Sequence, residues 1–152
     1  MMIKDMLKRE NVRLVESVKS WEDAIILSTQ SLLDQGYITQ QYPDKIIELT
    51  KKYGPYYALA PFLALVHARP EDGVIKKQLA VILLHNPVNF KGDTTPIRLL
   101  ITLAAENSES HLDVLRQLGE LLSDENVLKQ LLNATSEEML YDLLTKYENG
   151  DK

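Results

Sequence analysis

The chain has 152 residues, of which 45% are apolar and 26% charged; this is the balance of one folded domain and excludes a disordered chain. It has no cysteine, which excludes disulfide bonds, thiolate metal sites and a cysteine nucleophile. The net charge of −5 argues against nucleic acid as a partner, and the excess of acidic residues lies in residues 104–152.

The amino-terminal residues predict a strand rather than a membrane segment. Residues 1–11 mix charged and apolar side chains and lack the continuous apolar stretch that a signal peptide or membrane helix needs. We therefore expect a cytoplasmic protein without membrane insertion. Alternating apolar residues from Asn11 to Val18 predict a short strand that is half buried on one face.

Two helices are predicted next. The first runs from Trp21 to Gln35, with Ser20 as its N-cap and Gly36 as its left-handed terminator. The second runs from Tyr42 to Tyr53, because Pro43 is tolerated in a first helical turn and Gly54-Pro55 ends the pattern.

Apolar stretches at 56–68, 79–84 and 98–105 predict buried strands and the turns that join them. Helical patterns follow at 110–122, with Ser110 as the cap, and at 126–132 and 136–147. This order of elements predicts an α/β fold with a mixed β-sheet flanked by helices on both faces, in a single domain.

The histidines differ in their surroundings. His67 ends the apolar run Leu63-Ala64-Leu65-Val66 and is followed by a polar turn, which is a common location for a sheet-based active site. On this pattern alone, a structural histidine at a strand end is the more common case. His85 also falls at a predicted strand end, and we expect an exposed structural role for it.

Other polar and aromatic residues near His67 have ordinary explanations. Tyr56 and Tyr57 are expected to pack in the core and at its rim. Glu71 and Asp72 are expected to form a solvated turn, with the alternative that they orient Arg69. No HExxH spacing is present, so a zinc hydrolase is not expected.

Several segments together resemble enzyme IIA components of the bacterial sugar phosphotransferase system, in the mannitol and fructose group and especially its ascorbate-type branch. The resemblance covers nearly the whole chain and implies one type 2 enzyme IIA domain over residues 1–152. The segments are KYGPYYALAP (52–61), LALVHARPEDGV (63–74), PVNF (87–90) and LLITLAAENSESHLDVLRQLGELLSDEN (99–126).

The resemblance implies that His67 is the phosphorylated histidine and that His111 is the second active-site histidine, hydrogen-bonded to the phosphoryl group. An arginine of the mannitol-type members corresponds to Lys51, and together with Arg69 it is a candidate cation for stabilising that group. No metal or nucleotide cofactor is implied.

The implied activity is a phosphotransferase with a phosphohistidine intermediate. The phosphocarrier protein HPr would phosphorylate Nε2 of His67, and a cognate enzyme IIB would accept the group and serve the membrane permease IIC. The implied transported compound is L-ascorbate or a related sugar or pentitol. The alternative is a regulatory module in which phosphorylation of His67 controls a partner protein.

The chain departs from the family pattern at two positions. Phe62 replaces a usual glycine and Val66 replaces a usual proline, and either change is expected to alter the backbone path near His67. Phe62, Leu63 and Val66 are also candidates for an apolar partner surface, with packing in the core an equally open explanation.

Overall fold

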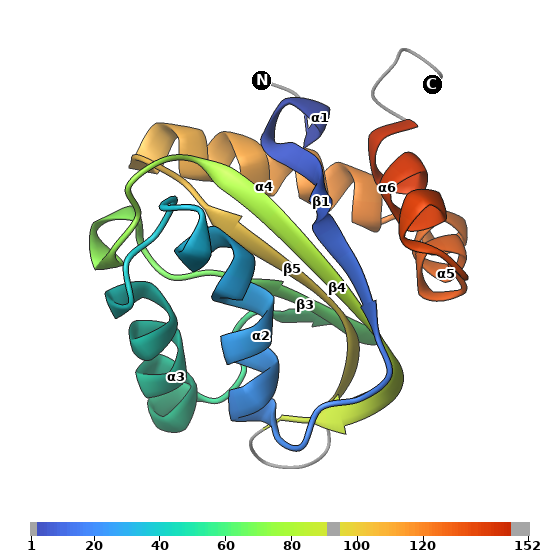
Figure 1. Ribbon diagram of the computed structural model, residues 1–152, viewed down its shortest axis with the longest axis horizontal. Coiled ribbons are helices and arrows are strands. Elements are labelled where there is room, and N and C mark those ends of the chain that lie inside the picture. Colours follow the sequence, from blue (N-terminus) through green and yellow to red (C-terminus); the bar gives the residue numbers. More distant parts are fainter. Residues whose placement is uncertain (1–2, 91–94, 147–152) are drawn as a thin grey trace.

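The computed structural model describes residues 3–90 and 95–146, and these form a mixed five-stranded sheet with helices on both faces (Figure 1). The α/β fold class predicted from the sequence is confirmed. The strands are β1 (Leu7–Val15), β2 (Ala58–Ala60), β3 (Phe62–Val66), β4 (Gln78–Asn89) and β5 (Pro96–Ala104). The helices are α1 (Ile3–Met6), α2 (Trp21–Asp34), α3 (Gln41–Tyr53), the 3-10 turn η1 (Pro70–Asp72), α4 (Ser108–Leu122), α5 (Glu125–Leu132) and α6 (Glu137–Lys146).

The strand order is β1-β4-β5-β3-β2, with both parallel and antiparallel neighbours. β1 runs parallel to β4, β4 antiparallel to β5, β5 parallel to β3, and β3 antiparallel to β2. In the parallel pair β3 and β5, Val66 lies opposite Thr102. The carboxyl ends of these two strands therefore meet at one edge of the sheet.

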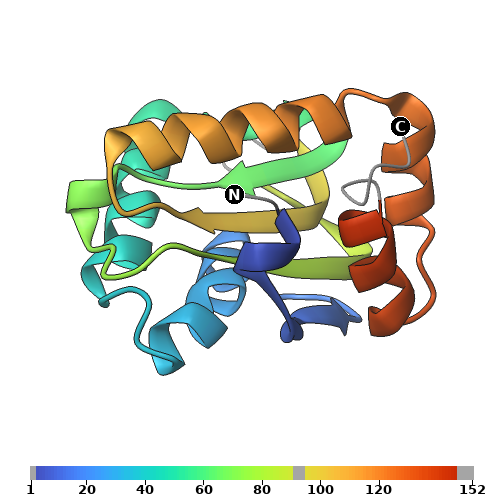
Figure 2. The same cartoon turned by 90° about the horizontal axis from the view of Figure 1, so that it is seen from above.

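The sheet separates two hydrophobic cores. Figure 2 shows it between α4 on one side and α2 on the other. Successive side chains of a strand point to opposite faces, so Leu63 and Leu65 join the core under α4, whereas Ala64 and Val66 join the core under α2 and α3. Because both faces are covered, the central strands are apolar throughout, which explains the unbroken apolar runs in the sequence.

Helix starts follow from side-chain caps. Ser20 Oγ accepts a hydrogen bond from the Asp23 backbone N–H at 3.2 Å, so α2 begins where the sequence predicts. The cap of α4 differs from the prediction, because Asn107 and not Ser110 occupies it. Asn107 Oδ1 accepts from the Ser110 N–H at 2.8 Å, and Ser110 Oγ accepts from the Asn107 N–H at 3.4 Å. This correction puts His111 in the first turn of the helix.

Other boundaries also differ from the prediction. β1 begins at Leu7 rather than Asn11, and the short helix α1 was not predicted. β4 continues to Asn89 through a register shift between Leu83 and Val88, so His85 lies within a strand and not at a strand end. The predicted end of the last helix at Tyr147 lies outside the described residues. Over residues 3–90 and 95–146, no helix is both long and apolar enough to cross a membrane.

Candidate active site

The sheet brings His67 and His111 together, although 44 positions separate them in the sequence. His67 follows β3 directly, and His111 lies in the first turn of α4, which is separated from the end of β5 by three residues. Because β3 and β5 are parallel neighbours, both chain segments leave the sheet at the same edge. The centroids of the two imidazole rings are 5.4 Å apart, and the ring planes are inclined by 56°.

The His67 ring is held through one nitrogen. Nδ1 lies 2.7 Å from the backbone carbonyl oxygen of Leu65. A carbonyl oxygen only accepts hydrogen bonds, so Nδ1 carries the proton and donates it to Leu65. In the neutral ring, Nε2 then carries the lone pair and is the nucleophilic atom.

Burial keeps this ring neutral. It lowers the pKa of His67 below its ordinary value, because the positive form is poorly solvated, and the hydrogen bond to Leu65 opposes this lowering only in part. Burial also lowers the pKa of His111, the neighbouring His67 lowers it further, and Glu71 opposes the effect. Near neutral pH both rings are therefore mainly uncharged, as a nitrogen nucleophile requires.

His111 presents the opposite polarity to the site. Its Nδ1 is buried and has no hydrogen-bond partner within residues 3–90 and 95–146. A buried N–H without an acceptor is rarer than a buried acceptor without a donor, which favours the proton on Nε2. His67 then offers a lone pair on its Nε2, while His111 offers an N–H donor.

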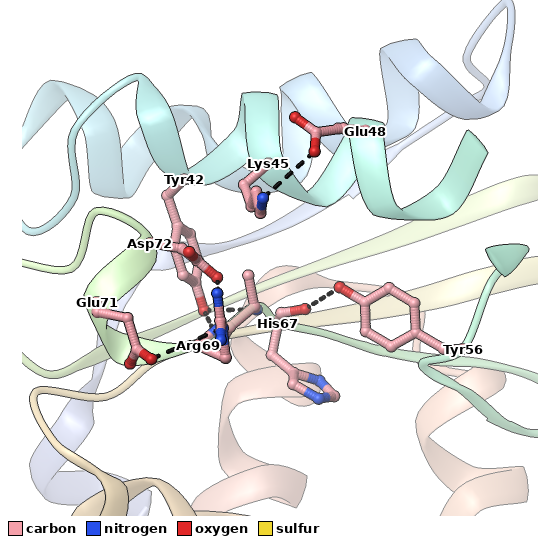
Figure 3. A network of polar contacts seen from close by, with 9 residues as sticks. Tyr42, Lys45, Glu48, Tyr56, His67, Arg69, Glu71 and Asp72 are labelled. Carbon is pink, nitrogen blue, oxygen red and sulfur yellow. Dashed lines mark hydrogen bonds and ion pairs between the residues drawn. The ribbon is translucent and has the colours of Figure 1, made fainter. Parts of the chain in front are cut away.

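Two tyrosines hold the backbone at the end of β3 (Figure 3). The Tyr56 hydroxyl donates a hydrogen bond to the carbonyl oxygen of His67, and its ring packs edge-on against the imidazole with 5.6 Å between centroids. The Tyr42 hydroxyl accepts from the Ala68 N–H at 3.1 Å and donates to the carbonyl oxygen of Leu103. The sequence interpretation of Tyr56 as packing at the core rim missed its hydrogen bond to His67, and Tyr42 was not singled out at all.

Arg69 is oriented by the two carboxylates that follow it. Its Nε lies 3.4 Å from Asp72 Oδ2 and 3.7 Å from Glu71 Oε2, and Asp72 also accepts from the Arg69 backbone N–H at 3.1 Å. Asp72 is buried, whereas 68% of the Arg69 side chain is exposed. The alternative in which these acids orient Arg69 is therefore the one that the structure supports, and a purely solvated turn is wrong for Asp72.

Lys51 lies in the last turn of α3, where it is exposed and lines a shallow groove with Asp44, Ile47, Glu48 and Lys52. Figure 3 shows another lysine of α3, Lys45, paired with Glu48 of the same helix, with its Nζ 3.2 Å from Glu48 Oε2. The sequence analysis did not single out Lys45. The helical spacing from Tyr42 to Lys45 is the signal that could have placed both on one face.

The expected apolar partner surface at Phe62, Leu63 and Val66 needs correction. Leu63 and Val66 are fully buried in the two cores, so neither can contact a partner. Phe62 is partly exposed, but it begins β3, at the end of the strand opposite to His67. It adopts φ +66°, a conformation that glycine takes freely and other residues take at a cost. Phe62 therefore adopts a backbone conformation that is typical of the glycine it replaces.

The remaining expectations concern metals and His85. His85 is exposed, as predicted, and together with Arg98 it lines a hollow formed in part by residues of β1, β4 and β5. Within the part of the chain that the structure describes, no three His, Asp or Glu side chains gather as metal ligands would.

Comparisons with known proteins agree on one family. A family model described as "Phosphoenolpyruvate-dependent sugar phosphotransferase system, EIIA 2" matches residues 5–147. The mannitol-specific cryptic phosphotransferase enzyme IIA component of Escherichia coli (strain K12) is 41% identical, over 96% of this chain and 99% of that protein. An ascorbate-specific EIIA component of Shigella boydii serotype 4 (strain Sb227) is 32% identical, over 96% and 97% respectively.

Solved structures give the same result. The solution structure of the mannitol-specific cryptic enzyme IIA from Escherichia coli superposes with a TM-score of 0.91, covering 96% of this chain and 99% of that one. A complex of the mannitol enzyme IIA with phosphorylated enzyme IIB from Escherichia coli matches with a TM-score of 0.79 at 28% identity, covering 93% and 99%.

Proposed function

Because the chain belongs to the type 2 enzyme IIA family of the phosphoenolpyruvate-dependent sugar phosphotransferase system, we propose that it relays a phosphoryl group on Nε2 of His67. The family resemblance stated from the sequence is confirmed. The observation that carries the proposal is the position of the His67 ring. Its Nδ1 is hydrogen-bonded to the Leu65 carbonyl, and the His111 ring lies next to it, with 5.4 Å between the ring centroids. This arrangement leaves one defined nucleophilic nitrogen beside one donor.

The transfer uses the lone pair of Nε2. It attacks phosphorus in a phosphohistidine of the donor protein, a new N–P bond forms, and the bonding pair of the old N–P bond returns to the donor ring. Positive charge develops on the His67 ring as the bond forms. The Nδ1–H bond to the Leu65 carbonyl strengthens with that charge, so the same contact that selects the nucleophile also stabilises the product.

The other site residues act on the phosphoryl oxygens. His111 donates from Nε2–H to one of them, because its buried Nδ1 is left as the acceptor nitrogen. Arg69 supplies a fixed positive charge two residues after His67, oriented by Glu71 and Asp72. Lys51, in the last turn of α3, is the proposed source of a second positive charge.

The proposed donor is the phosphocarrier protein HPr, and the proposed acceptor is a cognate enzyme IIB that serves a membrane permease IIC. The structural match to an enzyme IIA bound to phosphorylated enzyme IIB supports the acceptor. We propose L-ascorbate or a related sugar or pentitol as the transported compound, supported by the ascorbate-specific relative. A cytoplasmic location follows from these partners.

The test is phosphorylation in a reconstituted system. Incubation with phosphoenolpyruvate, enzyme I and HPr should add one acid-labile phosphate to the chain and to the His85→Ala control, but none to His67→Ala. Equal labelling of His67→Ala and the parent would refute the assignment. Transfer from the labelled chain to one of a panel of purified enzyme IIB proteins identifies the acceptor, whereas labelling without transfer to any of them would favour the regulatory alternative.

A further inference from the structure

Tyrosine hydroxyls bind consecutive backbone groups where β3 ends. Tyr56 binds the carbonyl of His67, and Tyr42 binds the N–H of the next residue, Ala68. Figure 3 shows the two phenols approaching this segment from different directions, Tyr42 from α3 and Tyr56 from the segment before β2. The backbone that carries the proposed nucleophile is therefore held on both sides of one peptide unit.

Tyr56 is itself anchored. Its ring packs edge-on against Tyr57, with 4.7 Å between centroids, and the Tyr57 hydroxyl lies 2.7 Å from Oγ1 of Thr50 in α3. The Tyr57 carbonyl accepts from the Leu65 N–H at 2.9 Å. Burial raises the pKa of Tyr56 to about 12, so its hydroxyl keeps the proton that it donates to His67.

This hydrogen bond restrains the imidazole as well as the backbone. The bond from His67 Nδ1 to the Leu65 carbonyl spans only two residues, so it forms only for a narrow set of backbone and side-chain torsions. Tyr56 fixes the direction of the His67 carbonyl and places its own ring against the imidazole. Both contacts favour the rotamer in which Nδ1 meets Leu65 and Nε2 remains the nucleophile.

Tyr42 connects the strand that carries His67 with the strand that carries His111. It is fully buried, and its hydroxyl contacts Ala68 after β3 and Leu103 near the end of β5. The distance between the two histidines depends on how these strand ends are held. Tyr42 therefore acts on the separation of the rings, whereas Tyr56 acts on the orientation of one of them.

We propose that Tyr56 and Tyr42 are positioning residues for phosphoryl transfer: Tyr56 selects the Nδ1–H form of His67, and Tyr42 sets the spacing between His67 and His111. The inference rests on the proposed function for its role in catalysis, but its effect on the His67 ring can be measured without any partner protein.

The experiment compares Tyr56→Phe and Tyr42→Phe with the matched control Tyr53→Phe, which removes an exposed phenol at the end of α3. ¹⁵N chemical shifts of the imidazole nitrogens report which nitrogen of His67 carries the proton. In Tyr56→Phe we expect this proton to be shared between Nδ1 and Nε2. The rate of phosphorylation by HPr should fall roughly three- to tenfold, the range for one lost hydrogen bond, with KM for HPr unchanged.

Tyr42→Phe should keep the His67 tautomer and slow transfer to enzyme IIB more than phosphorylation by HPr. Tyr53→Phe should match the parent in every measurement. A folded Tyr56→Phe variant with the parental tautomer and rate would overturn the role of Tyr56, even if Tyr42→Phe unfolds. Failure of the proposed function is a different result, since the parent would then take up no phosphate while the tautomer shift in Tyr56→Phe persisted.

Discussion

The backbone conformation of Phe62 predicts that a glycine variant is more stable than an alanine variant at this position, which reverses their usual order of stability. Phe62 has φ +66°, and it is the only residue other than glycine with positive φ in residues 3–90 and 95–146. Phe62→Ala and Phe62→Gly both remove the aromatic ring, so the difference between the two variants reports mainly on the backbone. Alanine retains a Cβ that disfavours this φ, whereas glycine does not.

The expected difference follows from two opposing terms. A residue with a Cβ in the left-handed region costs about 1–2 kcal/mol. Glycine instead lowers stability by about 0.4–1 kcal/mol, because it adds conformational freedom to the unfolded chain. We therefore expect Phe62→Gly to be more stable than Phe62→Ala by roughly 0.5–1 kcal/mol. At Leu59, an exposed residue of β2, the order should be the ordinary one, with alanine more stable by about 0.5–1 kcal/mol.

The assay is urea unfolding followed by circular dichroism, with the slope compared among all four variants so that only midpoint changes are interpreted. If Phe62→Ala is as stable as Phe62→Gly, or more stable, the backbone at this position is not under the strain that its φ indicates. If the glycine variant is also the more stable at Leu59, the difference does not come from the left-handed conformation.

Three further predictions concern the site. Because the pKa of His67 is lowered in the folded chain, the unfolded chain takes up a proton at higher pH than the folded one. The free energy of unfolding should therefore fall as the pH drops through the ordinary histidine pKa of about 6.5. Urea unfolding at pH 7.5 and 5.5 should show a smaller fall for His67→Ala than for the parent. His111→Ala should still accept phosphate but pass it to enzyme IIB about 10- to 100-fold more slowly, as measured by rapid quench. An unchanged rate would exclude the proposed hydrogen bond from His111 to the phosphoryl group. Gly73→Ala should lower the free energy of unfolding by about 2 kcal/mol or more, because φ is +125° and a Cβ would lie 2.7 Å from Thr39 Oγ1; a thermal melt like that of the parent would contradict this.

Local sequence patterns predicted most of the elements. Ser20 and Gly36 bound the α2 region because a cap and a left-handed terminator act within a few residues of themselves. The α4 cap was misplaced by a few residues, because Asn107 and Ser110 form one reciprocal capping box and both are good capping residues. Apolar runs marked the central strands but could not assign their order, since a strand buried on both faces shows no periodicity.

The chemistry of the site was only partly accessible from the sequence. The apolar run that ends in a polar turn made His67 a candidate, and only the family resemblance favoured a functional role for it and paired it with His111. The contacts of Tyr56 and Tyr42 were not accessible, because their partners are backbone atoms of residues 11 to 61 positions away. A hydrogen bond to a carbonyl leaves no mark on the identity of the residue that supplies it.

By itself, the sequence determined the fold class, the start of α2 and the histidine that is the candidate for phosphorylation, because capping, apolar patterning and side-chain chemistry act locally. Only the tertiary structure decided that β3 and β5 lie side by side in parallel, that two imidazoles 44 residues apart come within 5.4 Å, and that Nδ1 of His67 carries the proton. These features depend on strand pairing and on backbone acceptors, whose positions are set by the packing of the whole chain.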